Sequence, residues 1–259
     1  GGVPWKIANA DPEAAYIGLS YAVRPASAEA PRFVTCCSQV FDAEGAGLEF
    51  IAYETDDATV IRGNPFLSRV EMRRVIARSL VLYQRRHGGR SPMKLVVHKS
   101  TEFRREEVEG CFDAWPATNG LELVQVQQDS FWRGIRLDRV KDAKSAAAAY
   151  PCDRGTVVQI GARDVLLWTQ GNAPAVLGGR NYYKEGKGIP SPLVLTRWAG
   201  HGPWDDSARW VLGLSKMDWN NDALYDRLPV TLSYASVLAR TIKRMPSISA
   251  RPYAFRFFM

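Results

Sequence analysis

The sequence has few residues of the two types that most often bind transition metals. Its 259 residues include four cysteines and three histidines. The cysteines are Cys36, Cys37, Cys111 and Cys152, and no two of them have the C-x-x-C spacing of a zinc site. Four cysteines are also too few for the disulfide framework of a small secreted protein. We therefore expect a reduced, cytoplasmic protein without a zinc centre.

Long apolar runs are also missing. No uninterrupted apolar stretch approaches the ~20 residues that a membrane helix needs, and no secretory signal pattern is present. With 46% hydrophobic and 24% charged residues, the composition is that of a globular protein and excludes a disordered chain. The chain begins Gly1-Gly2-Val3 without an initiator methionine, which predicts a segment of a longer protein.

The positive charge lies mostly in the last third of the chain. The formal net charge is +7, and residues 180–259 hold 12 Lys or Arg against 6 Asp or Glu. The same region contains Trp198, Trp204, Trp210 and Trp219. Basic residues interleaved with aromatic residues suit a ligand with phosphates and stackable bases. A solvated basic surface fits the charge equally well, and the tryptophans fit core positions better than stacking platforms.

Hydrophobic patterning predicts an α/β fold. Three β-rich runs are followed by a long amphipathic helix, a strand, a second helix and another strand. The expected ranges are, in order, Tyr16–Arg24, Phe33–Asp42, Leu48–Glu54, a helix that follows Ser68 and ends at Gly88-Gly89, Met93–His98, Arg105–Trp115 and Leu121–Gln127. This is the order of the ribonuclease-H-like fold, in which an antiparallel three-strand meander is extended by strands that follow helices. We expect a mixed central sheet flanked by helices.

Two short motifs mark turns in this region. Glu44–Gly47 predicts the hairpin loop between the second and third strands. Ser68 predicts the N-cap of the long helix, with Glu71 three residues later as in a capping box.

Further elements are expected beyond residue 130. The predicted strands are Phe131–Leu137, Thr156–Gly161, Val165–Thr169 and Pro192–Trp198, and the predicted helices are Asp205–Lys216 and Val230–Arg244. Asp205 or Asp206 would cap the first of these helices, and Pro246 would end the second. On the second helix, Ser236, Arg240 and Lys243 recur on a polar face.

Acidic residues are missing where a ribonuclease-H-like nuclease needs them. Such a nuclease holds two divalent metals with carboxylates, one in the middle of the first strand and another after the strand that follows the long helix. The first of these strands, Tyr16–Ala22, contains no acid, and the end of the second, His98-Lys99-Ser100, contains none either. Serine is a poor Mg²⁺ ligand because its neutral hydroxyl supplies no charge to offset the dehydration of the metal. The sequence therefore predicts an enzyme scaffold without the metal site.

Several segments resemble the PIWI domain of Argonaute proteins, and above all that of short prokaryotic Argonautes. They are Tyr16–Ser20, Val96–Ser100, Leu214–Asp222, Tyr225–Thr231, Leu228–Ser236, Ala239–Pro246 and Pro252–Met259. Active members place Asp at Ser20 and Ser100, and His or Asp at Ser236. The resemblance implies a PIWI domain over residues 1–259, with residues 1–15 ending the MID–PIWI connection. It also implies that the protein is not a nuclease.

A function follows from this resemblance. It implies binding of a short guide RNA that pairs with target DNA, so that base pairing reads the sequence. It also implies an effector subunit with an APAZ region and a TIR, Sir2 or nuclease domain, activated in defence against invading DNA. Two alternatives stay open: an active guided nuclease whose acids lie elsewhere, and the PIWI domain of a long inactive Argonaute that acts alone.

Nine basic residues are expected at the nucleic-acid interface. They are Lys99, Arg104, Lys184, Lys187, Arg197, Arg227, Arg240, Lys243 and Arg244. By resemblance, the helix with Arg240 and Lys243 helps to build the pocket for the 5′ phosphate of the guide. The terminal carboxylate of Met259 is expected to bind Mg²⁺ in that pocket. Glu71 is a candidate for the family's mobile catalytic glutamate, although helix capping explains it better.

Overall fold

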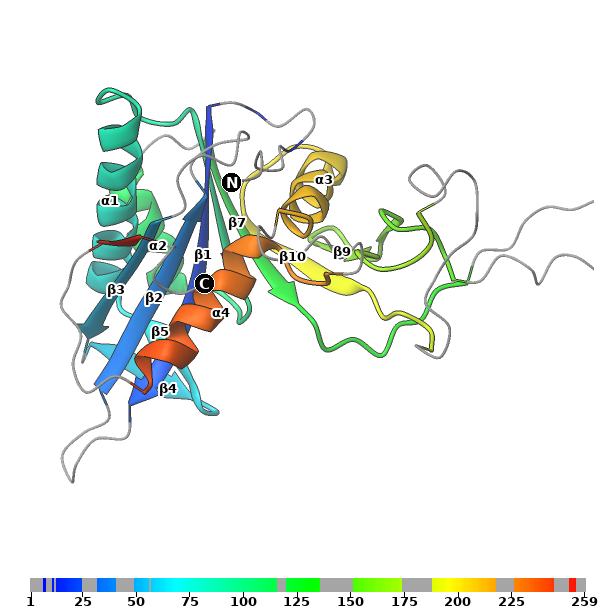
Figure 1. The fold of residues 1–259 in the computed structure, drawn as a ribbon, viewed down its shortest axis with the longest axis horizontal. Helices are drawn as coiled ribbons and strands as arrows, with labels where there is room; N and C mark the ends of the chain where they lie inside the picture. The colour runs from blue at the N-terminus through cyan, green and yellow to red at the C-terminus, as the bar shows by residue number, and fades with distance from the viewer. Residues whose placement is uncertain are drawn as a thin grey trace, which may run out of the picture.

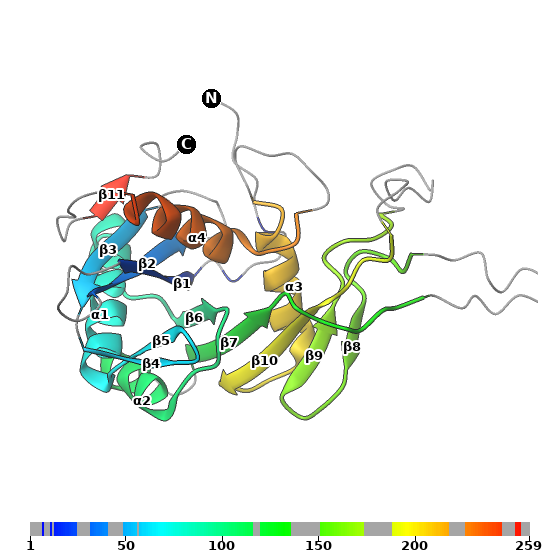
Figure 2. The ribbon, with the colours of Figure 1, turned by 90° about the horizontal axis from the view of Figure 1, so that it is seen from below.

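The structure is a computed structural model that describes most of the chain. The described residues are 7, 11, 13–24, 32–40, 49–55, 57–115, 120–135, 151–173, 188–217, 226–244 and 252–254. Within them a nine-stranded sheet has the order β11-β3-β2-β1-β6-β7-β10-β9-β8 (Figures 1 and 2). Its strands are β1 (Ala14–Arg24), β2 (Arg32–Val40), β3 (Glu49–Thr55), β6 (Lys94–Lys99), β7 (Leu121–Gln127), β8 (Val157–Gln159), β9 (Asp164–Leu167), β10 (Leu193–Ala199) and β11 (Pro252–Ala254).

The first three strands form the predicted meander. β1 pairs antiparallel with β2, and β2 pairs antiparallel with β3. β6 then lies parallel to β1, and β7 lies parallel to β6, because a helix returns the chain before each of them. The mixed sheet and its flanking helices confirm the predicted fold class. The predicted loop at Glu44–Gly47 lies outside the described residues.

The two helices in this half begin and end near their predicted positions. They are α1 (Arg69–Arg86) and α2 (Arg105–Ala114). The Ser68 hydroxyl caps α1 by accepting a hydrogen bond from the Glu71 amide at 3.2 Å. The Glu71 carboxylate pairs with Arg74, so the predicted capping box is half formed. After α1, Gly88 and Gly89 both have positive φ, which is the left-handed conformation that stops a helix.

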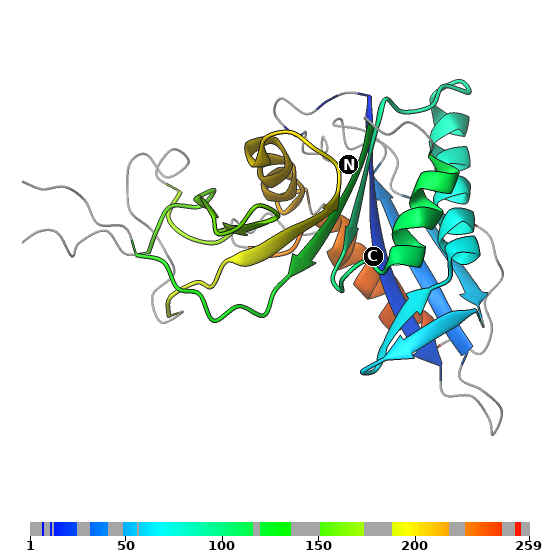
Figure 3. The same ribbon diagram turned by 180° about the vertical axis from the view of Figure 1, so that it is seen from behind.

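Helices cover both faces of the sheet. α1 and α2 pack on one face, whereas α3 (Trp204–Leu214) and α4 (Val230–Ile242) pack on the other (Figures 1 and 3). Side chains of β1 alternate between the two cores. Ile17 and Leu19 pack with α1 and α2, and Tyr16 and Ala22 pack with α4. Ser20 shares the parity of Tyr16 and Ala22, and it therefore faces α4.

One hairpin was not predicted. β4 (Ala58–Ile61) and β5 (Asn64–Leu67) pair antiparallel beside the main sheet. Arg62 and Gly63 connect them, and both have positive φ, as a two-residue hairpin turn requires. An arginine in this conformation gives little sequence signal, and the strands have four residues each.

Two local predictions were wrong. Residues 131–135 of the expected strand Phe131–Leu137 form no strand, and the backbone at Gly134 instead lies close against the Trp168 ring. Helix α3 begins after Pro203, so neither Asp205 nor Asp206 is its cap. Both aspartates lie in the first turn, where negative charge interacts favourably with the helix dipole.

The remaining strands extend the sheet away from the meander. β10 pairs antiparallel with both β7 and β9, and β8 pairs antiparallel with β9. This agrees with the three strands expected at Thr156–Gly161, Val165–Thr169 and Pro192–Trp198. α3 covers this end of the sheet through Trp204, Ala208 and Val211. Among the described residues, no helix combines the length and the apolar character that crossing a membrane requires.

Candidate nucleic-acid interface

A pocket of about 640 Å³ runs along α4 beside β1, and we call it the α4 groove. It brings together residues from β1, from the end of β7 and from α4. Its lining consists of Ser20, Tyr21, Ala22, Gln128, Leu228, Ser233, Ser236, Val237, Ala239, Arg240 and Lys243. Two residues at positions of missing acids, Ser20 and Ser236, therefore share one groove although they lie far apart in the chain.

Ser100 reaches the same edge of the sheet from the neighbouring strand. The parallel register of β1 and β6 ends with Leu19 beside Lys99, and Ser20 and Ser100 are the residues that follow this pair. Ser100 itself is exposed and lines a second pocket, of about 600 Å³, with Arg62 and Arg104. Ser20 and Ser236 thus line one pocket, whereas Ser100 lines a different one.

The described lining of the α4 groove carries positive charge. Its described lining contains two cationic side chains, Arg240 and Lys243, and no carboxylate. Hydroxyl groups of Ser20, Ser233 and Ser236 add neutral hydrogen-bonding groups. Arg240 and Lys243 are exposed at the C-terminal end of α4, as the polar-face prediction required. Ser233 could have been predicted, because it lies three residues before Ser236 on the same helix face.

Lys99 lies in the core and not at an interface. Its side chain is 0% exposed, and its Nζ donates to both Glu107 oxygens at 2.6 Å. The Phe66 ring lies 4.7 Å from the same ammonium. Burial lowers the pKa of Lys99, and the Glu107 charge opposes part of that effect. The prediction that Lys99 contacts a nucleic-acid backbone is wrong for this structure, because a buried and paired ammonium does not reach a phosphate.

Arg197 and Arg227 also have protein partners. Arg197 donates to Ser207 at 2.8 Å, pairs with Glu122 at 3.2 Å, and lies over the Trp204 ring. Arg227 donates to the carbonyl oxygen of Gln128 and to the Ser191 hydroxyl. Both guanidinium groups connect separate segments of the chain through these bonds, so their role in the described residues is to stabilise the fold.

Arg104 and Arg244 have fewer described contacts with the rest of the protein than Arg197 and Arg227. Arg104 pairs with Glu102 at 2.6 Å, and its guanidinium lies 4.9 Å from the Phe66 ring beside the Ser100 pocket. Arg244 is exposed just beyond α4 and does not line the α4 groove.

The other predicted residues, Lys184, Lys187 and Met259, lie outside the described residues. Glu71 is buried beside its cap, on the face of the sheet opposite the α4 groove.

Close contacts at its N-terminal end hold α4 on the sheet. His98 Nδ1 on β6 and Thr231 Oγ1 on α4 share a hydrogen bond of 3.0 Å. His98 is buried, and desolvation lowers its pKa from 6.5 to about 4, so it is neutral near pH 7. Beside it, the backbone of Gly18 on β1 lies against Thr231. These contacts fix the position of Ser236 relative to Ser20.

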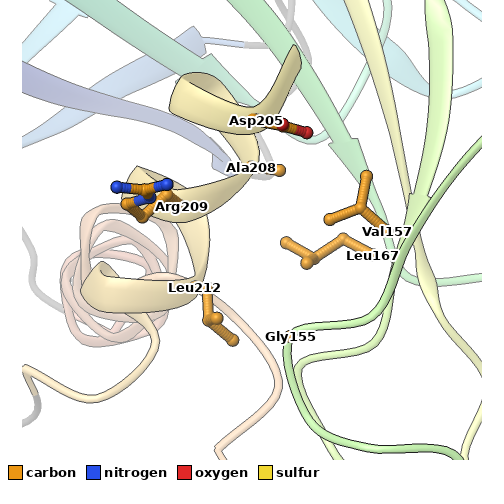
Figure 4. A pocket seen from close by; sticks show the side chains of 7 residues that line it. All are labelled: Gly155, Val157, Leu167, Asp205, Ala208, Arg209 and Leu212. Carbon is orange, nitrogen blue, oxygen red and sulfur yellow. The ribbon is translucent and has the colours of Figure 1, made fainter.

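A smaller pocket of about 180 Å³ lies between α3 and the β8–β9 hairpin (Figure 4). Its lining residues are Gly155, Val157, Leu167, Asp205, Ala208, Arg209 and Leu212. The facing walls are mainly apolar, and none of the predicted site residues lines it. The α4 groove is therefore the stronger candidate for an interface.

Comparisons with known proteins bear on the fold. No protein-family model and no curated protein matches the chain. Clostridium butyricum Argonaute, bound to a guide DNA and a 19-mer target DNA, matches with a TM-score of 0.68 and 16% identity over 95% of this chain and 29% of that one. Aquifex aeolicus Argonaute matches with a TM-score of 0.61 and 17% identity over 95% of this chain and 30% of that one. The C-terminal lobe of a budding yeast Argonaute matches with a TM-score of 0.62 and 15% identity over 88% of this chain and 46% of that one.

At these identities the similarity concerns the fold. The chain has the ribonuclease-H-like PIWI fold that is found in Argonaute proteins, as the sequence predicted. It spans less than half the length of each of these structures.

Proposed function

We propose that this chain is the PIWI domain of a short prokaryotic Argonaute and that it binds a guide and its target without cutting them. The observation that carries this proposal is the composition of the α4 groove. In an Argonaute-like fold, the groove combines Ser20 and Ser236 with Arg240 and Lys243 and has no carboxylate among its described lining residues.

The proposed lack of cleavage follows from the chemistry of serine. Two-metal hydrolysis needs carboxylates that hold the ions, activate water and stabilise the leaving oxygen. Ser20, Ser100 and Ser236 supply neutral hydroxyls in their place. These residues can still form hydrogen bonds with a nucleic-acid backbone that passes over the edge of the sheet. Sequence would be read by base pairing, while the protein contacts phosphates and the shape of the duplex.

The ligand in this proposal is a guide RNA paired with target DNA. Clostridium butyricum Argonaute is bound to guide and target DNA, which supports nucleic-acid partners for this fold. The preference for RNA is tested by equilibrium binding of single-stranded RNA and DNA guides of the same sequence, each with a 5′ phosphate or a 5′ hydroxyl. We expect the 5′-phosphorylated RNA to bind most tightly. Equal binding of all four strands would contradict the proposed guide recognition.

The proposal includes an effector subunit with an APAZ region and a TIR, Sir2 or nuclease domain. Target pairing would activate this subunit in defence against invading DNA. Co-expression with such a subunit should give a stable complex whose effector activity requires both guide and complementary target. Target binding by the protein without any such partner complex would favour the alternative of an Argonaute that acts alone.

Mg²⁺ is proposed at the 5′ phosphate of the guide and not as a catalytic metal. The resemblance to Argonaute proteins implies that the ligand from the chain is the Met259 carboxylate. Extending the chain beyond Met259 should weaken binding of 5′-phosphorylated guides more than that of 5′-hydroxyl guides, and most strongly with Mg²⁺ present. If the ratio of the affinities for 5′-phosphorylated and 5′-hydroxyl guides changes neither with the extension nor with Mg²⁺, Met259 is not part of the site.

A further inference from the structure

The two cations of the α4 groove lie on the same helix face as a serine that replaces a metal ligand. Arg240 follows Ser236 by four residues and Lys243 follows it by seven, which corresponds to about 6 Å and about 10 Å along the axis of α4. All three side chains line one groove, and Ser20 lines it from β1. The hydroxyls therefore lie within reach of the same stretch of backbone as the cations.

Arg240 and Lys243 differ from Arg104 and Arg197 because no acid among the described residues pairs with them. Arg197 pairs with Glu122, and Arg104 pairs with Glu102. For Arg240 and Lys243, the described part of the chain offers no carboxylate within ion-pair distance, and no acid is found among the groove lining. Two neighbouring cations in one groove, without an acid partner in the part of the chain that the structure describes, suit an anionic ligand that runs along the helix.

The serines at positions 20 and 236 change the electrostatic interaction between the groove and such a ligand. A pair of carboxylates at Ser20 and Ser236 would repel a phosphodiester unless divalent metal ions lay between them. Neutral hydroxyls cause no such repulsion and can donate hydrogen bonds to phosphate oxygens. We infer that the α4 groove is a metal-independent phosphodiester site, in which Arg240 and Lys243 replace the charge that metal ions supply in a cleaving homologue.

This inference rests on the proposed function and adds a property to it: at this site the backbone of the guide–target duplex binds equally well with and without divalent ions. A cleaving site of the same fold needs metal both for chemistry and to neutralise its own acids. The serines therefore remove cleavage and also remove the need for metal in binding the phosphodiester.

The test compares S20D/S236D with S20N/S236N, because Asn has the size of Asp without its charge. Affinity for a guide–target duplex is measured in chelator and in Mg²⁺, with a 5′-hydroxyl guide so that no metal is recruited by a 5′ phosphate. In chelator, the Asp variant should bind roughly tenfold more weakly than the Asn variant or worse, because each added charge repels the phosphate. Mg²⁺ should restore most of that loss in the Asp variant and leave the other proteins nearly unchanged.

A gel of the recovered target checks that it has not been cut, and thermal unfolding checks that both variants fold. Equal affinities of the Asp and Asn variants in chelator, with normal binding by the unmodified protein, would remove this inference and leave the proposed function. Loss of binding of the duplex with the 5′-hydroxyl guide by the unmodified protein, on adding chelator, would also overturn it. Failure of the unmodified protein to bind any guide–target duplex would remove both.

Discussion

Gly18 on β1 and Thr231 on α4 lie so close that no side chain fits between them. A Cβ atom at Gly18 would lie 2.9 Å from the Thr231 Cβ, and closer still to the Thr231 carbonyl carbon and oxygen. Gly18 lies two residues before Ser20, and Thr231 lies five residues before Ser236. The absence of a side chain at Gly18 therefore sets the distance between the two walls of the α4 groove.

The first prediction is that G18A displaces α4 and opens this groove. Backbone atoms of Thr231 cannot move aside as a flexible side chain would, so we expect a destabilisation of about 1–3 kcal/mol or somewhat more. Guide binding should weaken beyond what the stability loss explains. The matched control is G63A, because a Cβ at Gly63 meets nothing within 4 Å, although its positive φ adds local strain. Unchanged binding by folded G18A would show that the position of α4 does not matter to the site.

The second prediction concerns His98 and pH. Its pKa is lowered from 6.5 to about 4 in the folded protein, so the unfolded chain binds a proton that the folded chain does not. Stability should therefore fall as the pH is lowered from about 6.5 to about 4, by an amount on the order of 3 kcal/mol from this group. H98Q can keep a hydrogen bond to Thr231 but does not titrate. Urea denaturation across this pH range should show a smaller slope for H98Q, and identical slopes would contradict the role of His98.

The third prediction concerns the Lys99–Glu107 pair. Besides Lys99, the Glu107 carboxylate accepts hydrogen bonds from the amides of Leu67 at 3.1 Å and Arg104 at 2.9 Å. K99M leaves this buried charge without its main partner and should cost about 3–5 kcal/mol. The double variant K99M/E107Q removes the unpaired charge and should recover part of the loss in denaturant unfolding.

Nucleic-acid affinity provides the control for this pair. Where K99M/E107Q is folded, it should bind guides as the unmodified protein does, because Lys99 is buried. A selective loss of guide affinity in a stably folded variant would return Lys99 to the interface.

The fourth prediction is that R240A and K243A weaken guide binding and flatten its salt dependence. Each lost phosphate contact should reduce the log–log slope by about 0.7 for a single strand. R73A is the matched control, since Arg73 is exposed on α1 across the sheet from the groove. Affinity and slope should be measured over a range of salt concentrations. A loss for R73A equal to that for R240A would indicate a general charge effect and no site.

Periodic patterns in the sequence predicted the parts of the fold that depend on local residues. The helical spacing of Ser236, Arg240 and Lys243 placed them on one polar face, and the structure confirms this. The order of strands and helices was sufficient to predict the meander and the parallel strands that follow it. Each of these depends on burial along a single element.

Predictions that depended on contacts between distant segments agreed less well with the structure. The burial of Lys99 depends on Phe66 and Glu107, which lie on other elements, although the continuous apolar run before Lys99 indicates a strand buried on both faces. Arg197 and Arg227 were assigned to the interface from their charge, whereas their hydrogen-bond partners come from remote parts of the chain. Gln128 joined the groove with no signal beyond its position at the end of a strand.

The central claim is guided binding without cleavage, and one binding assay tests it most directly. The protein is loaded with a guide RNA and incubated in Mg²⁺ or Mn²⁺ with a labelled DNA target that is either complementary or scrambled. Bound fraction and target length are read from the same samples. The account predicts that the complementary target binds much more tightly than the scrambled one and stays at full length. Metal-dependent cutting of the complementary target, or equal affinity for both targets, would contradict it.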